Sequence, residues 1–381
     1  MIAVIADDLT GAAELGGIGL RYKLSVEVCM DAGAHSNPDL LIISTDTRSG
    51  SRQAAELEMA RMTQAVSALN PSFIFKKIDS VLRGHVLAET QAQFKVLGYS
   101  KALFVPANPA LGRTIKSGTY FIDGKPIHKT GFAFDPEFPI RESEIIKMLG
   151  AAGDMVNVHP PKDRFIHTGI VIGEAESEED LKLWAALASE SILLGGASGF
   201  FSALLEKFYS KLPIQEQQKF TAFNQPALYV CGSAFQQSND RVKAIKNARG
   251  PVSYLPPEAV CSDNENRIQQ WADEAVHFLQ KYQKAVIAID PESVKNASFN
   301  AVKLRKLTAA VVKKITGRVK IEELLIEGGS TASAVLNEIG IKKLVPVQEL
   351  APGIIRSETE NHIHITLKPG SYNWPQEAWM F

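Results

Sequence analysis

Short apolar runs alternate with amphipathic stretches along most of the chain. The run "MIAVIADD" precedes "LTGAAELGGIGLRY", "DLLIISTDTRSG" precedes "SRQAAELEMARMTQAVSAL", and "SFIFKKIDS" precedes "HVLAETQAQFKVL". Nearly continuous apolar runs are typical of parallel strands that helices cover on both faces. The alternation therefore predicts an α/β fold, with a mostly parallel sheet flanked by helices.

This pattern lapses between Pro106 and Pro139, where the chain reads "PANPALGRT" and then "GTYFIDGKPIHKTGFAFDPEFP". A structureless segment of that length is uncommon inside a compact domain unless it serves a function. We expect an excursion from the sheet, with a hairpin around "YFIDGKPIHKT", that lies over the functional site.

Two domains are expected from the length and from a second break in the pattern. At 381 residues the chain exceeds the size at which a single hydrophobic core keeps growing. The polar stretch "SKLPIQEQQKFTAFNQP" has two prolines and no clear period, and a second α/β series with "ALYVCGS", "AVIAID" and "ELLIEGG" follows it. We predict an N-terminal domain at residues 1–210, a linker at 211–226 and a C-terminal domain at 227–381, each domain with its own mostly parallel sheet.

Composition narrows the classes of function. Hydrophobic residues make up 45% and charged residues 22% of the chain, and the formal net charge is -1. These values are ordinary for a soluble globular protein and give no overall field for nucleic acid or anionic membrane. The most apolar window, residues 191–205, is broken by glycines and is too short to span a bilayer, and the first residues form a strand-like run rather than a secretion signal. We expect a cytoplasmic protein without a nucleic-acid or membrane partner, and a homo-oligomer stays open.

Cysteine and histidine spacing argues against a metal site built by the protein. Cys29, Cys231 and Cys261 are far apart and show no CxxC spacing, which is typical of small buried side chains in a reducing compartment. The eight histidines show no HExxH or paired-ligand spacing.

Two acids, Asp7 and Asp8, follow the first predicted strand in "ADDLTG". In open α/β sheets ligands bind outside the carboxyl ends of the strands. A carboxylate at such a position can accept a hydroxyl proton, hold Mg²⁺ or bind sugar hydroxyls. The alternative is that Asp8 caps a helix that begins near Leu9 and that Asp7 is merely solvated, which explains one acid but not two.

Further polar residues follow the next two strands. In "STDTRSG" a turn with an N-cap at Ser49 or Ser51 accounts for most of the pattern, but not for Arg48, whose fork suits a carboxylate. In "KKIDSVLRGH" four polar residues crowd a strand-to-helix junction, and a glycine permits a tight path: Lys77, Asp79, Ser80, Arg83 and Gly84. This set offers hydrogen bonds to a polyol and a clamp for an acid, and a surface charge run is the weaker alternative.

The excursion adds Asn108, Arg113 and Thr114, which lie among turn-forming residues. They either contact substrate or belong to a rigid turn, and both interpretations stay open.

In the C-terminal half, "IEGGSTASAVL" at 326–336 leads from a strand through two glycines into a helix of small residues. Backbone N–H groups and the helix dipole at such a junction favour phosphate. The chain contains no GxxxxGK[ST] motif, and a plain turn with Ser330 as the N-cap is the alternative. Because "CGSAFQQS" at 231–238 repeats the arrangement, we expect a nucleotide site. "GGASG" at 195–199 lacks GxGxxG, and we interpret it as helix packing.

Taken in order, these motifs resemble the four-carbon acid sugar kinase family, which includes the threonate, erythronate and 3-oxo-tetronate kinases. The resemblance rests on "IADDLTGAAE", "KKIDSVLRGHV", "PANPALGRT" with "YFIDGKPIHKTGFAFDP", and "EGGSTASAVL". It runs through nearly the whole chain and is strongest before residue 137. It implies two α/β domains, of which the N-terminal one holds the acid sugar and the C-terminal one holds ATP.

Carried over by position, the resemblance implies two sets of site residues. The set around the sugar is Asp8, Arg48, Asp79, Ser80 and Arg83. The set that holds ATP is Ser233, Gly328, Gly329, Ser330, Thr331 and Gly370. "KIDSVLRG" is more similar to the threonate and erythronate branch. One segment departs from the family, because its members tend to end with a Lys-Ser-Gly-Gly-Phe-Gly-like run where this chain reads "LKPGSYNWP" at 367–375.

The resulting hypothesis is an ATP-dependent kinase that phosphorylates a terminal hydroxyl of a threonate- or erythronate-like acid. Arg48 and Arg83 clamp the substrate carboxylate, and Asp8 or Asp79 accepts the hydroxyl proton, with Asp8 slightly favoured and Mg²⁺ bridging phosphate oxygens. The remaining substrate-binding residues are Asp7, Lys77, Asn108 and Arg113, with Asp7 in a more structural role. Two alternatives stay open: an NAD-dependent oxidoreductase that grips its cofactor with "GGASG", and a non-catalytic sugar-acid-binding protein, which the altered C-terminal run supports.

Overall fold

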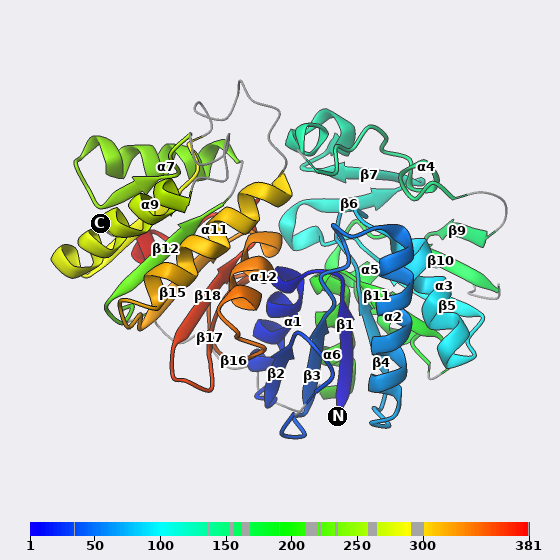
Figure 1. The fold of residues 1–381 in the computed structure, drawn as a ribbon. Helices are drawn as coiled ribbons and strands as arrows, with labels where there is room; N and C mark the ends of the chain where they lie inside the picture. Colours follow the sequence, from blue (N-terminus) through cyan, green and yellow to red (C-terminus); the bar gives the residue numbers. More distant parts are fainter. Residues whose placement is uncertain are drawn as a thin grey trace. The chain divides into compact units, whose positions relative to one another are not determined.

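The computed structural model describes residues 1–33, 35–135, 137–151, 155–161, 168–189, 191–209, 220, 222–232, 235–257, 265–290, 301–379 and 381. They fall into two compact units, the first unit (Met1–Gln215) and the second unit (Glu216–Phe381). In each, helices flank a mostly parallel sheet (Figure 1), so the predicted fold class is confirmed. Of the predicted linker 211–226, only residue 220 and residues 222–226 are described, and the linker stays a prediction.

The sheet of the first unit is parallel throughout, in the order β2-β3-β1-β4-β11-β5-β10-β9. Its strands are β1 (Ile2–Ala6), β2 (Val26–Cys29), β3 (Leu40–Ser44), β4 (Ile74–Lys77), β5 (Lys101–Val105), β9 (Val156–His159), β10 (Gly169–Gly173) and β11 (Leu193–Gly196). Every residue of β1, β2 and β3 is buried. Continuous burial explains why these strands read as unbroken apolar runs.

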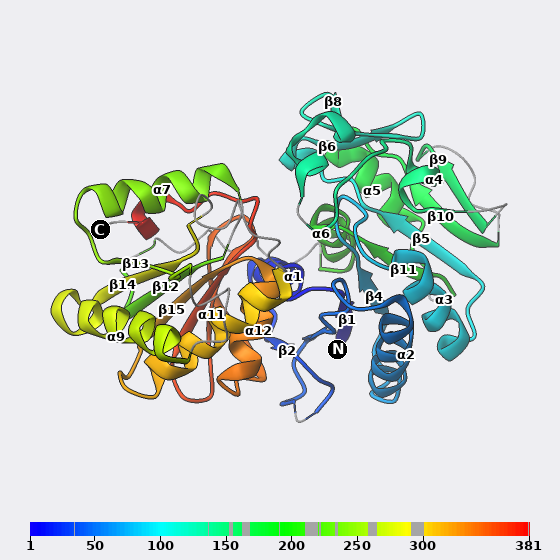
Figure 2. The same cartoon turned by 45° about the horizontal axis from the view of Figure 1, so that its top comes forward.

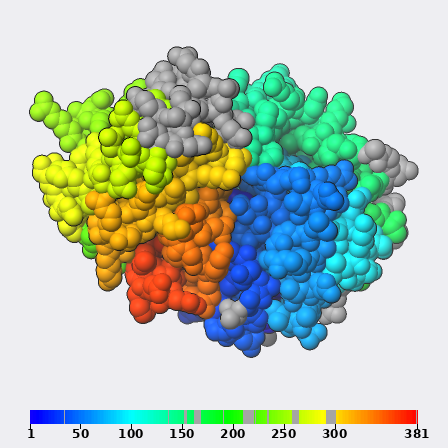
Figure 3. All heavy atoms as spheres, in the orientation of Figure 1, coloured from blue at the N-terminus to red at the C-terminus, as the bar shows by residue number. Residues whose placement is uncertain are grey.

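Helices cover both faces of this sheet (Figures 1 and 2). They are α1 (Leu9–Arg21), α2 (Arg52–Ser67), α3 (Val86–Leu97), α4 (Ile145–Met148), α5 (Glu178–Ala186) and α6 (Ser198–Tyr209). Helix α2 packs against α3, and α6 packs against both α1 and α5. In the space-filling view the blue atoms of α2 lie at the surface of the first unit (Figure 3). The apolar side of α2, with Met59, Met62 and Val66, packs on Ile5 and Ile43 of the sheet.

The predicted excursion forms a small antiparallel sheet of its own. Its strands are β6 (Arg113–Lys116), β7 (Thr119–Ile122) and β8 (Lys125–Pro126), flanked by the 3-10 turns η1 (Pro109–Leu111), η2 (Ile127–Lys129) and η3 (Gly131–Phe134). The chain reverses between β7 and β8 at Asp123 and Gly124, both with positive φ, as a tight hairpin requires. In both ribbon views this small sheet lies at the carboxyl edge of the large sheet of the first unit (Figures 1 and 2).

The second unit has the strand order β13-β14-β12-β15-β18-β17-β16. The first five strands in this order, β13, β14, β12, β15 and β18, pair in parallel, whereas β17 pairs antiparallel with both β18 and β16. The strands are β12 (Ala227–Cys231), β13 (Val252–Tyr254), β14 (Lys284–Ala288), β15 (Glu323–Glu327), β16 (Lys343–Ala351), β17 (Ile354–Glu358) and β18 (His364–Lys368). The helices are α7 (Gln236–Asn247), α9 (Glu265–Tyr282), α11 (Ala301–Thr316) and α12 (Gly329–Glu338), with a final 3-10 turn η5 (Gln376–Trp379).

Aromatic side chains from the C-terminal run close the core of the second unit. Trp374 and Trp379 stack with ring centroids 6.0 Å apart, and Trp379 packs edge-on against Tyr229 of β12. The segment after β18 is therefore part of this core. Among the described helices, none has both the length and the apolar character that crossing a membrane requires.

Candidate active site

Three neighbouring strands of the first unit end at one edge of the sheet. Ala6 of β1 is paired with Ser44 of β3 on one side and with Lys77 of β4 on the other. Helix α1 leads from β1 toward β2, whereas α2 and α3 lead from β3 and β4 toward the opposite side. Such a reversal of direction between adjacent strands marks the usual ligand crevice of an open α/β sheet. The polar residues predicted from the sequence follow these three strands.

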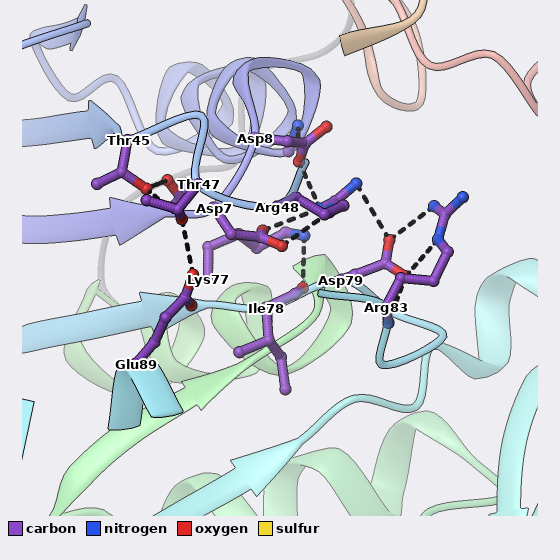
Figure 4. A network of polar contacts seen from close by, with 12 residues as sticks. Asp7, Asp8, Thr45, Thr47, Arg48, Lys77, Ile78, Asp79, Arg83 and Glu89 are labelled. Carbon is purple, nitrogen blue, oxygen red and sulfur yellow. Dashed lines mark hydrogen bonds and ion pairs between the residues drawn. The ribbon is translucent and has the colours of Figure 1, made fainter. Parts of the chain in front are cut away.

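Arg48 is the centre of this cluster (Figure 4). Its Nε donates to Asp7 Oδ2 at 2.7 Å and its Nη2 donates to Asp7 Oδ1 at 2.9 Å. The same Nη2 donates to Asp8 Oδ1 at 2.8 Å, and Nη1 lies 3.5 Å from Asp79 Oδ1. Asp7 is thus buried and paired rather than solvated. Burial raises the pKa of Asp7 despite the Arg48 charge, and the three carboxylates raise the pKa of Arg48 well above its ordinary value despite burial.

Asp8 has the capping role considered from the sequence, and it also belongs to the polar cluster around Arg48. It is the N-cap of α1, where Oδ1 accepts a hydrogen bond from Gly11 N at 3.1 Å. Oδ2 accepts a further bond from the Thr10 hydroxyl at 2.6 Å. Burial acts to raise the pKa of Asp8, but the charges of Arg48 and Lys77 together with the Thr10 hydroxyl lower it overall. Asp8 is therefore an ionised carboxylate in a fixed orientation.

Asp79 is held more tightly than Asp8. Arg83 donates to its two oxygens through Nε and Nη2, both at 2.8 Å, and the backbone N–H of Arg83 adds a bond of 3.1 Å. Burial acts against ionisation, but Arg83 and Arg48 hold the pKa of Asp79 far below its ordinary value. The loop that carries this fork turns back at Gly84, which has a φ of +89°. A Cβ at Gly84 would lie 3.1 Å from Arg48 Cγ, so the glycine lets the loop pass close over Arg48.

Lys77 and Lys76, adjacent at the end of β4, have different environments. Lys77 Nζ donates to Ile78 O at 2.9 Å and faces the Asp8 side of the cluster. Lys76 is fully buried, with its Nζ 2.6 Å from Glu89 Oε2. Because successive strand residues point to opposite faces, only Lys77 is available to the candidate site.

The excursion adds residues to the same edge of the sheet. Arg113 donates from Nη1 to the Ser80 hydroxyl, and Arg83 donates from Nη1 to Asp135 Oδ2 at 2.8 Å. The guanidinium carbons of both arginines lie over the Phe132 ring, 5.6 Å (Arg83) and 5.9 Å (Arg113) from its centroid. Two cations thus lie over one aromatic ring.

Asn108 lies beside this group but bonds elsewhere. Its backbone N–H and C=O pair with the C=O and N–H of Arg113, and its side-chain amide donates to the Ser198 hydroxyl at 2.9 Å. Ser198 in turn donates to Glu14 of α1 at 2.8 Å. Nine residues of the first unit were predicted to belong to the site, and the side chains of all but Asn108 lie together at this edge: Asp7, Asp8, Arg48, Lys77, Asp79, Ser80, Arg83 and Arg113.

Three residues of this edge were not predicted from the sequence: Thr10, Phe132 and Asp135. Thr10 belongs to "ADDLTG", and a hydroxyl two residues after an N-cap acid could have suggested the bond. Phe132 and Asp135 lie in "GFAFDP", which is separated by about fifty residues from their partner Arg83. No local pattern links such distant residues.

In the second unit, β12 and β15 are the adjacent strands whose following helices diverge. Helix α12 begins at Gly329 with Gly328 as the N-cap, so Ser330 lies inside the first turn and is not the cap. Gly328 has a φ of +89° and no side chain that could cap the helix. Thr331 lies close to the end of β12, since a Cβ at Gly232 would be 2.5 Å from its Oγ1. Backbone N–H groups at such a start suit a phosphate.

The altered C-terminal run is built onto this junction. Lys368 O accepts from Gly328 N at 2.8 Å. The buried Lys368 Nζ donates to Tyr372 O at 2.7 Å and to Gly370 O at 3.4 Å, and burial lowers its pKa. Trp374 Nε1 donates to Glu327 Oε1 at 2.5 Å. Ser233, predicted to bind the nucleotide, lies outside the described residues.

Two of the three glycines of "GGASG" are explained by packing between strands, and the third, Gly199 of α6, meets Leu181 of α5, which agrees with the predicted helix packing. Gly195 and Gly196 are the last residues of β11. A Cβ on Gly195 would lie 2.6 Å from Lys76 O, and one on Gly196 would lie 2.3 Å from Val105 O. Side chains are therefore excluded here by the neighbouring strands. Within the described part of the chain, no group of three His, Cys, Asp or Glu residues could hold a metal ion.

Comparison with known proteins also divides the chain into an N-terminal and a C-terminal domain. Residues 2–204 match a family described as a sugar-binding N-terminal domain, and residues 228–372 match one described as a nucleotide-binding C-terminal domain. A D-threonate kinase from Salmonella typhimurium is 26% identical over 390 residues, which cover 92% of this chain and 89% of the relative. A 3-oxo-tetronate kinase from Pseudomonas fluorescens is 23% identical over 415 residues, covering 98% and 94%.

A crystal structure of a Haemophilus influenzae protein has the same fold. Its TM-score is 0.70 at 20% identity, with 99% of this chain and 98% of that chain covered. The sequence matches extend through both units, and the first of them alone spans more than half of the chain. The chain therefore belongs to the four-carbon acid sugar kinase family, a family of phosphotransferases that pair a sugar-binding N-terminal domain with a nucleotide-binding C-terminal domain.

Proposed function

We propose that this protein is an ATP-dependent kinase that transfers the γ-phosphoryl group to a terminal hydroxyl of a four-carbon acid sugar of the threonate or erythronate type. The first unit holds the acid sugar and the second unit holds the nucleotide. The observation that carries the proposal is the placement of Asp8 and Lys77. Both side chains reach the same position beside Gly11, because a Cβ added to Gly11 would lie 2.6 Å from Asp8 Oδ1 and 3.1 Å from Lys77 Nζ. A carboxylate and an ammonium group therefore lie close together there.

In this proposal Asp8 accepts the hydroxyl proton and Lys77 neutralises the charge that develops on the transferred group. Phosphoryl transfer depends on positioning and charge more than on a strong base, so a carboxylate with a lowered pKa is sufficient. Both carboxylates accept hydrogen bonds on each oxygen, but the charged fork of Arg83 holds Asp79 and keeps its pKa far below the ordinary value, so Asp79 is the weaker proton acceptor. The structure thus supports Asp8 over Asp79 as the base.

The arginines divide between two roles. All three nitrogens of the Arg48 guanidinium face Asp7, Asp8 or Asp79, which supports a positioning role for Arg48 instead of the expected clamp on substrate. Arg83 is likewise paired, with Asp79 and Asp135, but its side chain is more exposed than that of Arg48, 20% against 12%. It also lies over the Phe132 ring together with Arg113, which supports a site for the substrate carboxylate beside these two arginines. An acid bound there points its far hydroxyl away from the arginines.

On the nucleotide side, the start of α12 at Gly328 and Gly329 suits the phosphates of ATP. Mg²⁺ would neutralise phosphate charge when bound. The described residues hold no cluster of three metal ligands, so the phosphate oxygens of the nucleotide would have to bind the ion.

The substrate branch follows from the resemblance of "KIDSVLRG" to the threonate and erythronate kinases and from the D-threonate kinase relative. A coupled assay of ADP release with ATP, Mg²⁺ and a panel of four-carbon sugar acids tests the proposal. We expect release that depends on threonate or erythronate and is absent without acid. Stabilisation of the protein by the acid without ADP release would favour a binding protein, and thermal stabilisation by NAD but not ATP would favour an oxidoreductase.

A further inference from the structure

Tyr120 lies in the excursion on the face that turns toward the candidate site. On the ladder between β6 and β7, Tyr120 stands directly opposite Ile115. Arg113 is two residues from Ile115 on the same strand, so its side chain shares that face. From this face Arg113 reaches the Ser80 hydroxyl. Tyr120 therefore points to the same side of the small sheet as a residue of the site.

The hydroxyl of Tyr120 is fully buried and has no hydrogen-bond partner among the residues that the structure describes. Other buried tyrosines are paired: Tyr22 donates to Ser202 O and Tyr229 donates to Ala378 O, each at 3.3 Å. An unpaired buried hydroxyl destabilises a fold, and native structures contain few of them. A ligand atom that binds beside such a hydroxyl would supply the missing partner.

The charges around Tyr120 belong to the site. Burial raises the pKa of Tyr120, and the two charges that act on its hydroxyl are those of Arg113 and Asp79. Tyr120 is thus a neutral phenol near neutral pH, and it has one O–H to donate. Arg113 already donates to Ser80, and Asp79 accepts the fork of Arg83. Tyr120 is thus a polar group of this neighbourhood that has no hydrogen bond to any described residue.

We propose that the Tyr120 hydroxyl donates a hydrogen bond to an oxygen of the bound four-carbon acid and is a specificity-determining residue of the sugar site. This inference rests on the proposed function, because the ligand that completes the bond is the acid sugar. Buried polar groups that a substrate fails to pair discriminate strongly against that substrate, so the bond favours an acid with an oxygen at this position.

The variant Tyr120→Phe tests the inference, since it removes one oxygen and keeps the ring. We expect KM for the acid sugar to rise about tenfold, because one hydrogen bond to a buried partner is lost, while KM for ATP stays unchanged. The thermal midpoint of the free protein should stay equal or rise, because an unpaired hydroxyl is removed. The upward shift of that midpoint on adding the acid should shrink.

Tyr22→Phe is the matched control in the same unit. It removes a hydroxyl that is paired with Ser202 O, so it should lower the thermal midpoint of the free protein and leave both KM values unchanged. If Tyr120→Phe behaves in the same way, or if its acid KM equals that of the wild type, Tyr120 is a structural residue and the inference is wrong. The wild type separates the two proposals: with no acid-dependent ADP release, the proposed function itself fails. The acid-induced shift in thermal midpoint then tests the Tyr120 bond by binding alone, and an equal shift in wild type and variant overturns it.

Discussion

Arg48 holds Asp7 through two parallel hydrogen bonds, from Nε to Oδ2 at 2.7 Å and from Nη2 to Oδ1 at 2.9 Å. The pair joins the end of β1 to the loop after β3. Both side chains are largely buried, and the same guanidinium reaches Asp8. The pair therefore fixes the backbone that carries the proposed base, which gives a structural reason for two acids in "ADD".

The first prediction concerns the stability of this pair. Arg48→Ala leaves the Asp7 carboxylate buried without a cation, which should lower the free energy of unfolding by about 3 kcal/mol. Removing both charges in Asp7→Asn/Arg48→Gln should restore part of that loss, because position 7 then holds no unpaired charge, whereas Asp8 still loses its bond from Arg48. Urea denaturation of the wild type and the two variants measures both effects. A single variant as stable as the wild type would show that the pair does not organise this edge.

The second prediction separates Asp8 from Asp79. Asp8→Asn should lower kcat about a hundredfold with little change in KM for the acid, the usual cost of losing a positioned proton acceptor. Asp79→Asn should act mainly on KM for the acid, because Asp79 orients Arg83. Steady-state kinetics with saturating ATP gives both values. A kcat for Asp8→Asn near that of the wild type would exclude Asp8 as the base.

The third prediction concerns the acid clamp. Arg83→Ala should raise KM for the acid at least tenfold and leave KM for ATP unchanged, since a charge-assisted bond to a carboxylate is lost. Arg61→Ala is the control, because Arg61 is an exposed arginine of α2 that pairs with Glu58. Equal weakening of acid and ATP binding by Arg83→Ala would move Arg83 out of the sugar site.

The fourth prediction compares two glycines of the second unit with positive φ. Gly328 precedes α12 with a φ of +89°, and Gly340 follows it with a φ of +78°. Alanine at either position should cost about 1 kcal/mol of stability, because both conformations are strained for other residues. Of these two variants, only Gly328→Ala should raise KM for ATP, since Gly328 lies at the helix start that we propose binds the phosphates and Gly340 lies at the other end. A similar rise for Gly340→Ala would mean that lost stability, not phosphate contact, explains the effect.

The fifth prediction concerns acid pH. Asp8 and Asp79 have pKa values lowered from the ordinary 3.8, so each stabilises the fold above that value and loses its contribution as pH falls below it. Asp7 acts in the opposite sense, because its raised pKa makes protonation favour the folded state as pH falls. We expect urea midpoints to decline below about pH 4, and less steeply in Asp79→Asn. Parallel curves for the wild type and Asp79→Asn would contradict this assignment.

The sequence predicted the strand ends well, because parallel strands place their carboxyl ends at one edge. Asp8, Arg48 and Asp79 could therefore be grouped before their contacts were known. It did not predict that the guanidinium of Arg48 faces three aspartates, because a fork suits any carboxylate. It also gave no role to Asp135, whose bond to Arg83 depends on the folding of a segment distant in the chain.

The alternation of apolar and polar residues was sufficient to predict the fold class. It was not sufficient to predict which side chains face the site. Lys76 and Lys77 are identical neighbours in sequence, yet strand pleating buries one against Glu89 and presents the other to the site. Tyr120 belongs to "YFIDGKPIHKT", but its proposed role depends on an unpaired hydroxyl, which only the side-chain positions reveal.

Proton-coupled phosphorus NMR of the product tests the central claim most directly. The wild-type protein is incubated with ATP, Mg²⁺ and D-threonate or D-erythronate. We predict a new phosphomonoester signal split into a triplet by the protons of a terminal CH₂ group. A doublet would place the phosphate on an inner hydroxyl and an unsplit signal would place it on the carboxylate. Either result, or ADP formation without any phosphorylated acid, would contradict transfer to the terminal hydroxyl.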